Sequence, residues 1–213
     1  GQNLFEDSSS FSGEWGVDEY FDTAKVKECI VVGIDNGNNK RLNEYNPYDN
    51  ERFGKGEGNL YADFLVKTLK PFIDRRFRTR RNKENTFVAG SSMGGLISMY
   101  AICEYPKVFG GAACLSTHWP GIFSMEGNPI PGAFIHYLKT NLPDPKKHKI
   151  YFDYGTATLD ALYPPLQQKA DEVMKEKGFT GKNWITKEFP GEDHSEKAWH
   201  KRLHIPLTFL LGK

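Results

Sequence analysis

The chain has 213 residues, of which 38% are hydrophobic and 14% aromatic, a globular composition that excludes a disordered protein. Its 28 Lys and Arg nearly balance its 27 Asp and Glu, so no basic surplus exists to bind nucleic-acid phosphates. No apolar run approaches the roughly 18 residues of a membrane-spanning helix. Composition therefore predicts neither a nucleic-acid nor a membrane partner, and leaves the oligomeric state open.

Apolar runs of strand length alternate with helical patterns along the chain. The first run, 28–35 (ECIVVGID), is continuous and rich in β-branched residues, as is typical of a strand buried on both faces. The segment 59–77 follows with apolar residues near helical spacing, and Pro71 predicts a kink or a restart within that helix.

The rest of the chain repeats this alternation. Further strands are predicted at 85–90, 110–116, 149–155 and 183–189, and further helices at 94–106, 162–178 and 195–212, the last bent near Pro206. Strands and helices at this interval predict βαβ units, and hence a parallel sheet with helices on both faces. We expect a single α/β domain over 1–213, a three-layer sandwich.

Two long segments interrupt the alternation, 36–58 and 116–132. Both follow the C-terminal ends of predicted strands, where open α/β sheets bind ligands. Loops of this length inside a domain are usually lids or binding loops.

These loops supply candidate substrate-binding residues. His118 could hydrogen-bond a substrate oxygen and Trp119 could stack on a sugar or an aromatic acyl group, with packing inside the loop as the alternative for both. Asp35 and Asn36 end the first predicted strand and should point towards the ligand side, although an Asx turn explains them equally well.

The stretch Gly90-Ser91-Ser92-Met93-Gly94 matches G-x-S-x-G with Ser92 at the centre. The bare motif is weak, but here a predicted strand leads in and a predicted helix leads out, which is the setting of a nucleophile elbow. Such a turn strains the serine backbone, and side chains on either side would collide with the neighbouring strand and helix. The alternative is a glycine-rich turn whose serine caps the helix.

A nucleophilic serine needs an imidazole to accept its proton and a carboxylate to orient that imidazole. Among six histidines, His194 lies in a Pro/Gly turn between the last predicted strand and the last helix, where the base is expected. We expect the histidines that lie on predicted helices, or just before a predicted strand, to be surface or packing residues. Asp153 and Asp160 are both candidate acids. Asp160 lies beyond the strand end and suits the role better, whereas Asp153 lies within the strand and could be structural.

The sequence indicates no cofactor and no metal. No phosphate-binding loop or dinucleotide fingerprint occurs, and the three cysteines, Cys29, Cys103 and Cys114, lack metal or redox spacing. We interpret all three cysteines as small hydrophobic residues, with Cys29 and Cys114 in buried strands.

Several linked motifs resemble the Putative esterase family of α/β hydrolases. They are GQNLF (1–5), SGEWGVDE (12–19), VVGIDNG (31–37), R-x-x-E-Y-x-P (41–47), AGSSMGG (89–95), GTATLD (155–160) and PGEDHSE (190–196). That family includes siderophore esterases of the enterobactin type, S-formylglutathione hydrolases, and feruloyl and acetylxylan esterases. The resemblance covers essentially the whole chain and implies Ser92, Asp160 and His194 as the catalytic triad.

The resemblance further implies an oxyanion hole made by the backbone N–H groups of Met93 and Gln2. It implies a secreted or periplasmic location, and acetyl or feruloyl esters of plant polysaccharides as substrates. The alternatives are a siderophore or thiol-ester hydrolase, or an inactive relative that binds carbohydrate. In relatives, strands precede GQNLF; they are missing here, so we expect a sheet without its first strands or a chain that is part of a longer one.

Overall fold

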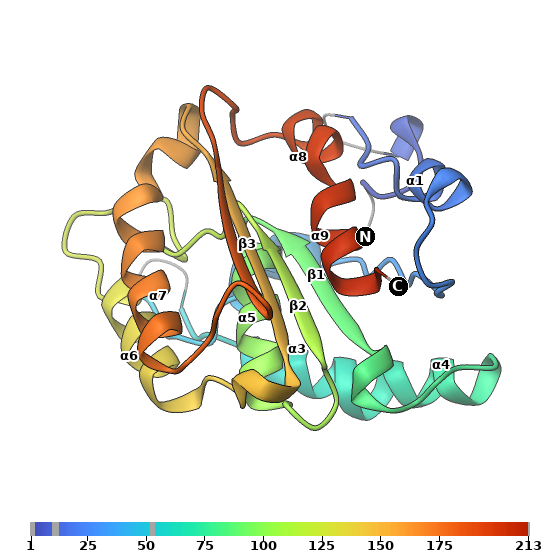
Figure 1. Ribbon diagram of the computed structural model, residues 1–213. Helices are drawn as coiled ribbons and strands as arrows, with labels where there is room; N and C mark the ends of the chain where they lie inside the picture. The colour runs from blue at the N-terminus through green and yellow to red at the C-terminus, as the bar shows by residue number, and fades with distance from the viewer. Residues whose placement is uncertain (1–2, 10–12, 52–53, 213) are drawn as a thin grey trace.

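The computed structural model describes residues 3–9, 13–51 and 54–212. Its centre is a parallel sheet in the order β1-β2-β3-β4, with helices on both faces (Figure 1). The strands are β1 (Phe87–Ser91), β2 (Gly111–Leu115), β3 (Lys149–Gly155) and β4 (Trp184–Phe189). The predicted α/β sandwich is therefore confirmed, and β1, which leads to Ser92, is an edge strand of the described sheet.

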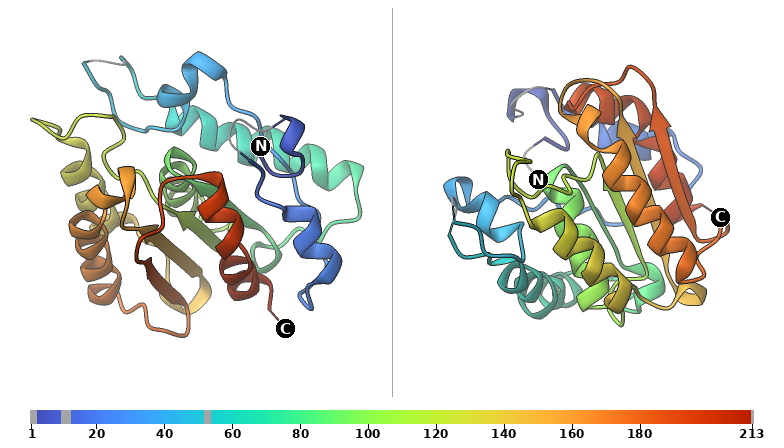
Figure 2. Two further views of the ribbon diagram at one scale, coloured as in Figure 1. Left: turned by 90° about the horizontal axis from the view of Figure 1, so that it is seen from above. Right: turned by 90° about the vertical axis from the view of Figure 1, so that its left-hand side faces the viewer.

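Two helical layers enclose the sheet, as the further views in Figure 2 show. One face carries α3 (Gly58–Asp63), α5 (Met93–Glu104), α6 (Ile130–Asn141) and α7 (Pro164–Glu176). The other carries α1 (Val17–Thr23), α8 (Glu196–Arg202) and α9 (His204–Leu211). The 36–58 loop contains α2 (Arg41–Glu44). Short 3₁₀ helices span Asp7–Ser9, Asn38–Lys40, Lys83–Asn85, Pro145–Lys147 and Thr158–Leu162.

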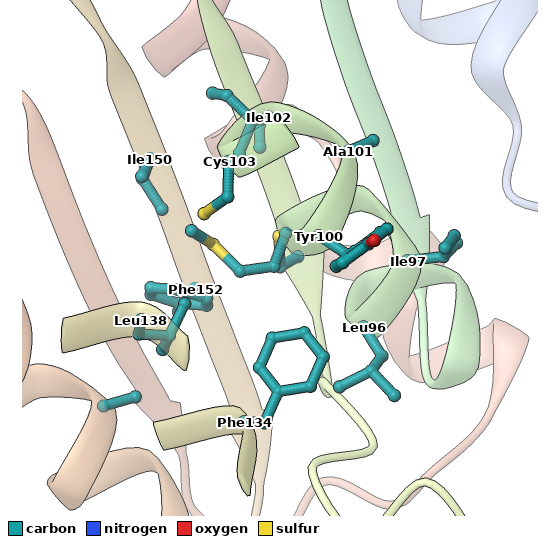
Figure 3. Close-up of a cluster of buried hydrophobic side chains, with 14 of the residues drawn as sticks. Leu96, Ile97, Tyr100, Ala101, Ile102, Cys103, Phe134, Leu138, Ile150 and Phe152 are labelled. Atoms are coloured by element: carbon teal, nitrogen blue, oxygen red, sulfur yellow. The ribbon is translucent and has the colours of Figure 1, made fainter. Parts of the chain in front are cut away.

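Each face of the sheet has its own hydrophobic core, because successive side chains of a strand point to opposite faces. In β2, Ala112 and Cys114 belong to the cluster beneath α5, α6 and α7, whereas Ala113 and Leu115 belong to the cluster beneath α8 and α9. Figure 3 shows side chains of α5, α6 and β3 gathered in the first cluster. The continuous apolar run of β2 thus reflects burial on both sides.

The prediction of a strand at 28–35 is wrong. This segment has no regular secondary structure, Ile30 and Val31 are 50% and 39% exposed, and Cys29 is exposed instead of buried. A strand requires partners for its backbone N–H and C=O groups. Among the described residues β1 is paired with β2 alone, and no strand is paired with 28–35.

The remaining elements lie within a few residues of their predicted positions. The helix predicted at 59–77 is continuous as α3, a π-helical stretch (Phe64–Leu69) and α4 (Lys70–Arg76), so the irregularity lies just before Pro71. The last helix is divided at Leu203, three residues before Pro206. Neither the short helix α1 nor the 12-residue helix α6, which begins within the predicted 116–132 loop, is among the predicted helices. None of the helices in the described parts of the chain is long and apolar enough to cross a membrane.

Candidate active site

Ser92 lies in a sharp turn between β1 and α5. Its backbone adopts φ 56° and ψ −124°, a conformation that non-glycine residues rarely take. Its backbone N–H is held by the last residue of β2, and its carbonyl by the chain that follows β2. The Ser92 N–H donates to Leu115 O at 2.9 Å, and the Ser92 carbonyl accepts from the His118 N–H at 3.1 Å. The strained turn is therefore anchored from the neighbouring strand.

The glycines of the motif have different roles. A Cβ at Gly90 would lie 2.6 Å from the backbone carbonyl of Gly94, so only glycine fits there, as predicted. A Cβ at Gly95 would lie 3.1 Å from Thr117 Oγ1. The absence of a side chain at Gly95 therefore lets α5 lie close to the sheet edge. A Cβ at Gly94 would meet no atom within 4 Å. The prediction that steric crowding requires glycine on both sides of Ser92 is therefore wrong for Gly94.

Met93 is the first residue of α5, so its N–H has no acceptor within the helix. A free N–H beside the nucleophile and at a helix N-terminus is suited to an oxyanion. Gln2, the other predicted oxyanion donor, lies outside the described residues.

His194 lies in the segment between β4 and α8, beside Asp160. The His194 Nδ1 is 2.5 Å from Asp160 Oδ1, and the His194 side chain is 14% exposed. Because a carboxylate can only accept, Nδ1 carries the proton and Nε2 of the neutral ring is left with a lone pair. The ring packs edge-on against Trp199 and Tyr163, with centroids 5.0 and 5.8 Å apart. With Nδ1 held by Asp160 and the ring held by two aromatic side chains, Nε2 is the nitrogen that can accept a proton.

The two candidate acids have different partners. Asp160 is fully buried in the 3₁₀ helix Thr158–Leu162, and its Oδ2 accepts from Gly155 N–H and Ser116 Oγ, each at 2.6 Å. Asp153, in β3, instead accepts from Arg202 and from the Tyr151 hydroxyl. Burial raises the pKa of Asp153 to about 6, although Arg202 opposes that shift. Of the two open alternatives, Asp160 is the one in contact with His194.

Trp119 does not reach the site, and the prediction that it stacks on substrate is wrong. It is 1% exposed, its ring lies 5.7 Å from those of Phe134 and Phe152, and its Nε1 donates to Gln167 at 2.9 Å. It is part of the core beneath α6 and α7. Phe123, 67% exposed, is the exposed aromatic residue of this loop.

His118 is also buried, and both of its nitrogens are occupied. Nε2 lies 3.0 Å from the Ile122 carbonyl and must donate, so Nδ1 accepts from the Tyr163 hydroxyl at 2.8 Å. Burial lowers the pKa of His118 to about 4, which keeps the ring neutral at pH 7. The prediction of a hydrogen bond from His118 to substrate is therefore wrong. His118 holds Tyr163, which packs against His194.

Asp35 and Asn36, the two candidate binding residues beside the 36–58 loop, have different surroundings. Asn36 Oδ1 accepts from the Asn38 N–H at 2.9 Å, an Asx turn, which was the alternative to a substrate contact. Asp35 lines a cavity of about 310 Å³ together with Gly37, Glu44, Glu57, Leu60, Tyr61 and Phe64. The loop is tied to its neighbour, since Asn46 Nδ2 donates to Gly121 O at 3.3 Å.

The other histidines have the surroundings expected of surface or packing residues. His136, His200 and His204 are exposed, and His148 is buried against the carbonyls of Pro106 and Asp144. In the described parts of the chain, no group of three or more His, Cys, Asp or Glu side chains could hold a metal ion.

Ser116 and Arg202 contact the acid and are absent from the sequence predictions. Ser116 directly follows β2, and Arg202 lies three residues after Trp199, on the buried side of α8. The signal that could have indicated Arg202 is its helical spacing from a buried tryptophan. An arginine on the buried side of a helix requires a buried anion as its partner.

Residues 4–206 match the family model described as Putative esterase. The uncharacterized protein YbbA of Bacillus subtilis is 27% identical over 225 residues, covering 100% of this chain and 83% of YbbA. An endo-1,4-beta-xylanase/feruloyl esterase of Xylanibacter ruminicola is 27% identical over 187 residues, covering 88% of this chain and 22% of the relative.

A solved structure with the same fold is that of the enterobactin esterase FES from Shigella flexneri, with a TM-score of 0.61 and 18% identity. The alignment covers 83% of this chain and 41% of FES. The chain thus spans less than two thirds of the length of the feruloyl esterase and of FES.

Proposed function

The chain belongs to the Putative esterase family, and from that premise we propose that it hydrolyses carboxylic esters through Ser92, His194 and Asp160. Two observations carry the proposal: the His194–Asp160 contact of 2.5 Å, and a serine held at φ 56° in a strand–turn–helix elbow. A serine hydroxyl at the start of a helix and an imidazole oriented by a carboxylate are the groups that nucleophilic ester hydrolysis requires.

In the proposed reaction Ser92 Oγ attacks the ester carbonyl carbon while its proton passes to His194 Nε2. The negative charge that develops on the carbonyl oxygen is stabilised by the Met93 N–H at the start of α5. The tetrahedral intermediate collapses, the C–O bond breaks, and the alcohol leaves with the proton from His194. Water then attacks the acyl-enzyme with the same base, releasing the acid and restoring Ser92.

Acetyl or feruloyl esters of plant polysaccharides are the proposed substrate class. Support comes from the similarity to the xylanase/feruloyl esterase and from Phe123, whose exposed ring lies 5.7 Å from His118 in the loop after β2. An exposed aromatic ring offers a surface for a sugar or a feruloyl ring. The shared fold with FES supports the alternative of a siderophore ester, since the molecule in the FES structure is an N-benzoyl amino acid that also carries an aromatic ring.

The experiment compares hydrolysis of p-nitrophenyl acetate and methyl ferulate by the wild type and by Ser92→Ala. We expect the variant to lose at least about 10³-fold in kcat/KM on both esters, because no other group can form the acyl-enzyme. Ser91→Ala, which removes the adjacent hydroxyl, is the matched control and should keep most of the activity.

Two results would count against the proposal. Equal rates in the wild type and Ser92→Ala would exclude Ser92 as the nucleophile. Loss of activity in Ser91→Ala with full activity in Ser92→Ala would mean that the elbow is set one residue earlier. The ratio of methyl ferulate to acetate turnover, and its fall in Phe123→Ala, tests the feruloyl assignment separately.

A further inference from the structure

A buried polar network lies beneath the contact between Asp160 and His194. It consists of Ser116 after β2, Asp153 in β3, Asp160, and Trp199 and Arg202 of α8, and we call it the Ser116 network. Ser116, Asp153 and Asp160 have no exposed surface, and Trp199 and Arg202 are 3% and 2% exposed. Polar groups buried to this extent must satisfy one another, so their geometry is informative.

The hydroxyl of Ser116 has a single possible hydrogen-bond arrangement. Trp199 Nε1 and Arg202 Nη2 both lie 2.9 Å from Ser116 Oγ, and both groups can only donate. These two donors occupy both lone pairs of the hydroxyl oxygen. The remaining hydrogen must therefore point to the third neighbour, Asp160 Oδ2, at 2.6 Å. Ser116 thus always donates to the carboxylate that contacts His194.

The backbone of Ser116 is fixed as firmly as its side chain. It adopts φ 42°, which is unusual for a residue other than glycine. Its N–H donates to Asp153 O at 2.8 Å and approaches Asp153 Oδ1 at 3.2 Å. The hydroxyl therefore has no freedom to follow Asp160 if that carboxylate moves, and holds it instead.

Arg202 fixes the network from the side of α8. Its Nη2 is 3.0 Å from Asp153 Oδ1 and 4.0 Å from Asp160 Oδ2, and its guanidinium lies 4.9 Å from the Phe189 ring. Its Nε and Nη1 are buried without a hydrogen-bond partner among the described residues. Leaving such donors unpaired is costly. Arg202 is therefore retained at this position by its contacts with Ser116 and the two aspartates.

We propose that Ser116 is a positioning residue of the candidate triad: its hydroxyl, aligned by Trp199 and Arg202, holds Asp160 in the one orientation that directs its Oδ1 to His194. The proposal rests on the proposed function, in which His194 is the base. Ser116 touches neither substrate nor the reacting atoms, and acts through Asp160.

Other titratable groups also face Asp160. They are His194 itself, Arg202 of α8, His118 of the loop after β2 and Tyr163 next to α7, with Asp153 on the far side of Ser116. At neutral pH His118 is neutral because burial lowers its pKa to about 4. Burial likewise raises the pKa of Tyr163, so Tyr163 is also neutral at this pH. Arg202 is then the one fixed cation among these groups.

The test uses Ser116→Ala and Ser116→Gly. Both remove the hydroxyl, and glycine also removes the cost of the positive φ, so an effect common to both comes from the hydroxyl. We expect kcat to fall about 10- to 100-fold with KM little changed, since a misaligned catalytic group costs about this much. The acid limb of the kcat/KM profile should move to higher pH, because Asp160 freed of one donor attracts the imidazolium more strongly.

The chain offers a matched control on β4. Trp184 Nε1 donates to Thr186 Oγ1 at 3.1 Å, and Thr186 Oγ1 donates to Asp171 at 2.8 Å, the same indole–hydroxyl–carboxylate sequence without a histidine. Thr186→Val removes that hydroxyl at nearly equal volume. We expect Thr186→Val to lower stability at most, and to leave kcat and the pH profile unchanged.

A second readout does not depend on turnover. A short hydrogen bond to a carboxylate shifts the His194 Nδ1–H proton strongly downfield in proton NMR, and we expect this resonance to move or vanish in both Ser116 variants but not in Thr186→Val. If the wild type hydrolyses no ester while the resonance responds as expected, the proposed function fails and the positioning role stands. Folded Ser116 variants with an unchanged resonance and pH profile would overturn the positioning role alone.

Discussion

At the scale of single residues, the candidate site depends on backbone positions as much as on reactive groups. Ser92, Ser116 and Thr158 all have positive φ without being glycine, and each directly contacts another residue of the site or belongs to it. Strain of this kind persists where the surroundings fix the conformation. The sequence indicates Ser92 through its motif, whereas no motif includes Ser116, and the motif that includes Thr158 (155–160) is used only for Asp160.

The glycines around Ser92 give a prediction at this scale. Gly90→Ala should lower the free energy of unfolding by about 1–3 kcal/mol, since the new Cβ would lie 2.6 Å from the Gly94 carbonyl, a backbone group that cannot easily move. Gly94→Ala should change the free energy of unfolding by less than about 1 kcal/mol, because its Cβ meets nothing within 4 Å. Urea unfolding of the two variants checks this, and equal losses would contradict it.

At the same scale, sequence patterns identified reactive residues better than binding residues. A nucleophile, base and acid are restricted to a few residue types at defined places, so Ser92, His194 and Asp160 could be selected and the structure brings the last two into contact. An aromatic residue in a loop has no such restriction. Trp119 and Phe123 lie four residues apart, yet one is buried and the other is exposed.

At the scale of elements, strands were predictable where the sheet supplies neighbours. Each of the four runs that pair in the sheet is predicted, whereas 28–35 is an apolar run rich in β-branched residues that has no partner among the described residues. An apolar, β-branched composition permits a strand, but a strand forms only where a neighbouring strand can pair with it. The short helix α1 has too few turns to show a periodicity, whereas the 12-residue helix α6 is not predicted because it begins with Ile130, Pro131 and Gly132, which are typical of a loop.

The helix that contains Pro71 gives a prediction at the scale of elements. Pro71 cannot donate a helical hydrogen bond, and the turn before it is widened so that the Lys70 N–H bonds to Leu65 O. Pro71→Ala restores a donor and should raise the free energy of unfolding by about 1–2 kcal/mol.

Pro164, at the first position of α7, is the matched control for that measurement. A proline is favourable there, so Pro164→Ala should lower the free energy of unfolding by up to about 1 kcal/mol. Urea denaturation midpoints with their slopes measure both changes. A loss of stability in Pro71→Ala would show that the widened turn is required by packing.

At the scale of the whole molecule, two buried groups make the free energy of unfolding depend on pH in opposite directions. The pKa of His118 is lowered from 6.5 to about 4, so only the unfolded state binds this proton between those values and stability falls as pH drops through them. The pKa of Asp153 is raised from 3.8 to about 6, so the native state binds that proton first and stability increases as pH drops from 6 to 4. In the wild type the two contributions largely cancel.

Single substitutions should separate the two contributions. Between pH 7 and 4.5, the free energy of unfolding should fall more in Asp153→Asn than in the wild type, and less in His118→Gln. Each difference from the wild type should be on the order of 1–3 kcal/mol, because one unit of pKa shift corresponds to about 1.4 kcal/mol. Urea unfolding at several pH values measures the slopes. Parallel slopes in all three proteins would contradict the assignment.

The four residues Leu115–His118 hold Ser92 and Asp160 directly, and His194 through one intermediate side chain. Leu115 and His118 hold the backbone of Ser92, Ser116 holds Asp160, and His118 holds the tyrosine that packs on His194. Among the described residues, the loop segment 119–132, which includes exposed Phe123, forms no hydrogen bond to Ser92, Asp160 or His194. The outer part of that loop can therefore be exchanged to admit a different ester, provided that the Ile122 carbonyl still accepts from His118 Nε2. Substrate choice can then change while the reactive groups keep their positions.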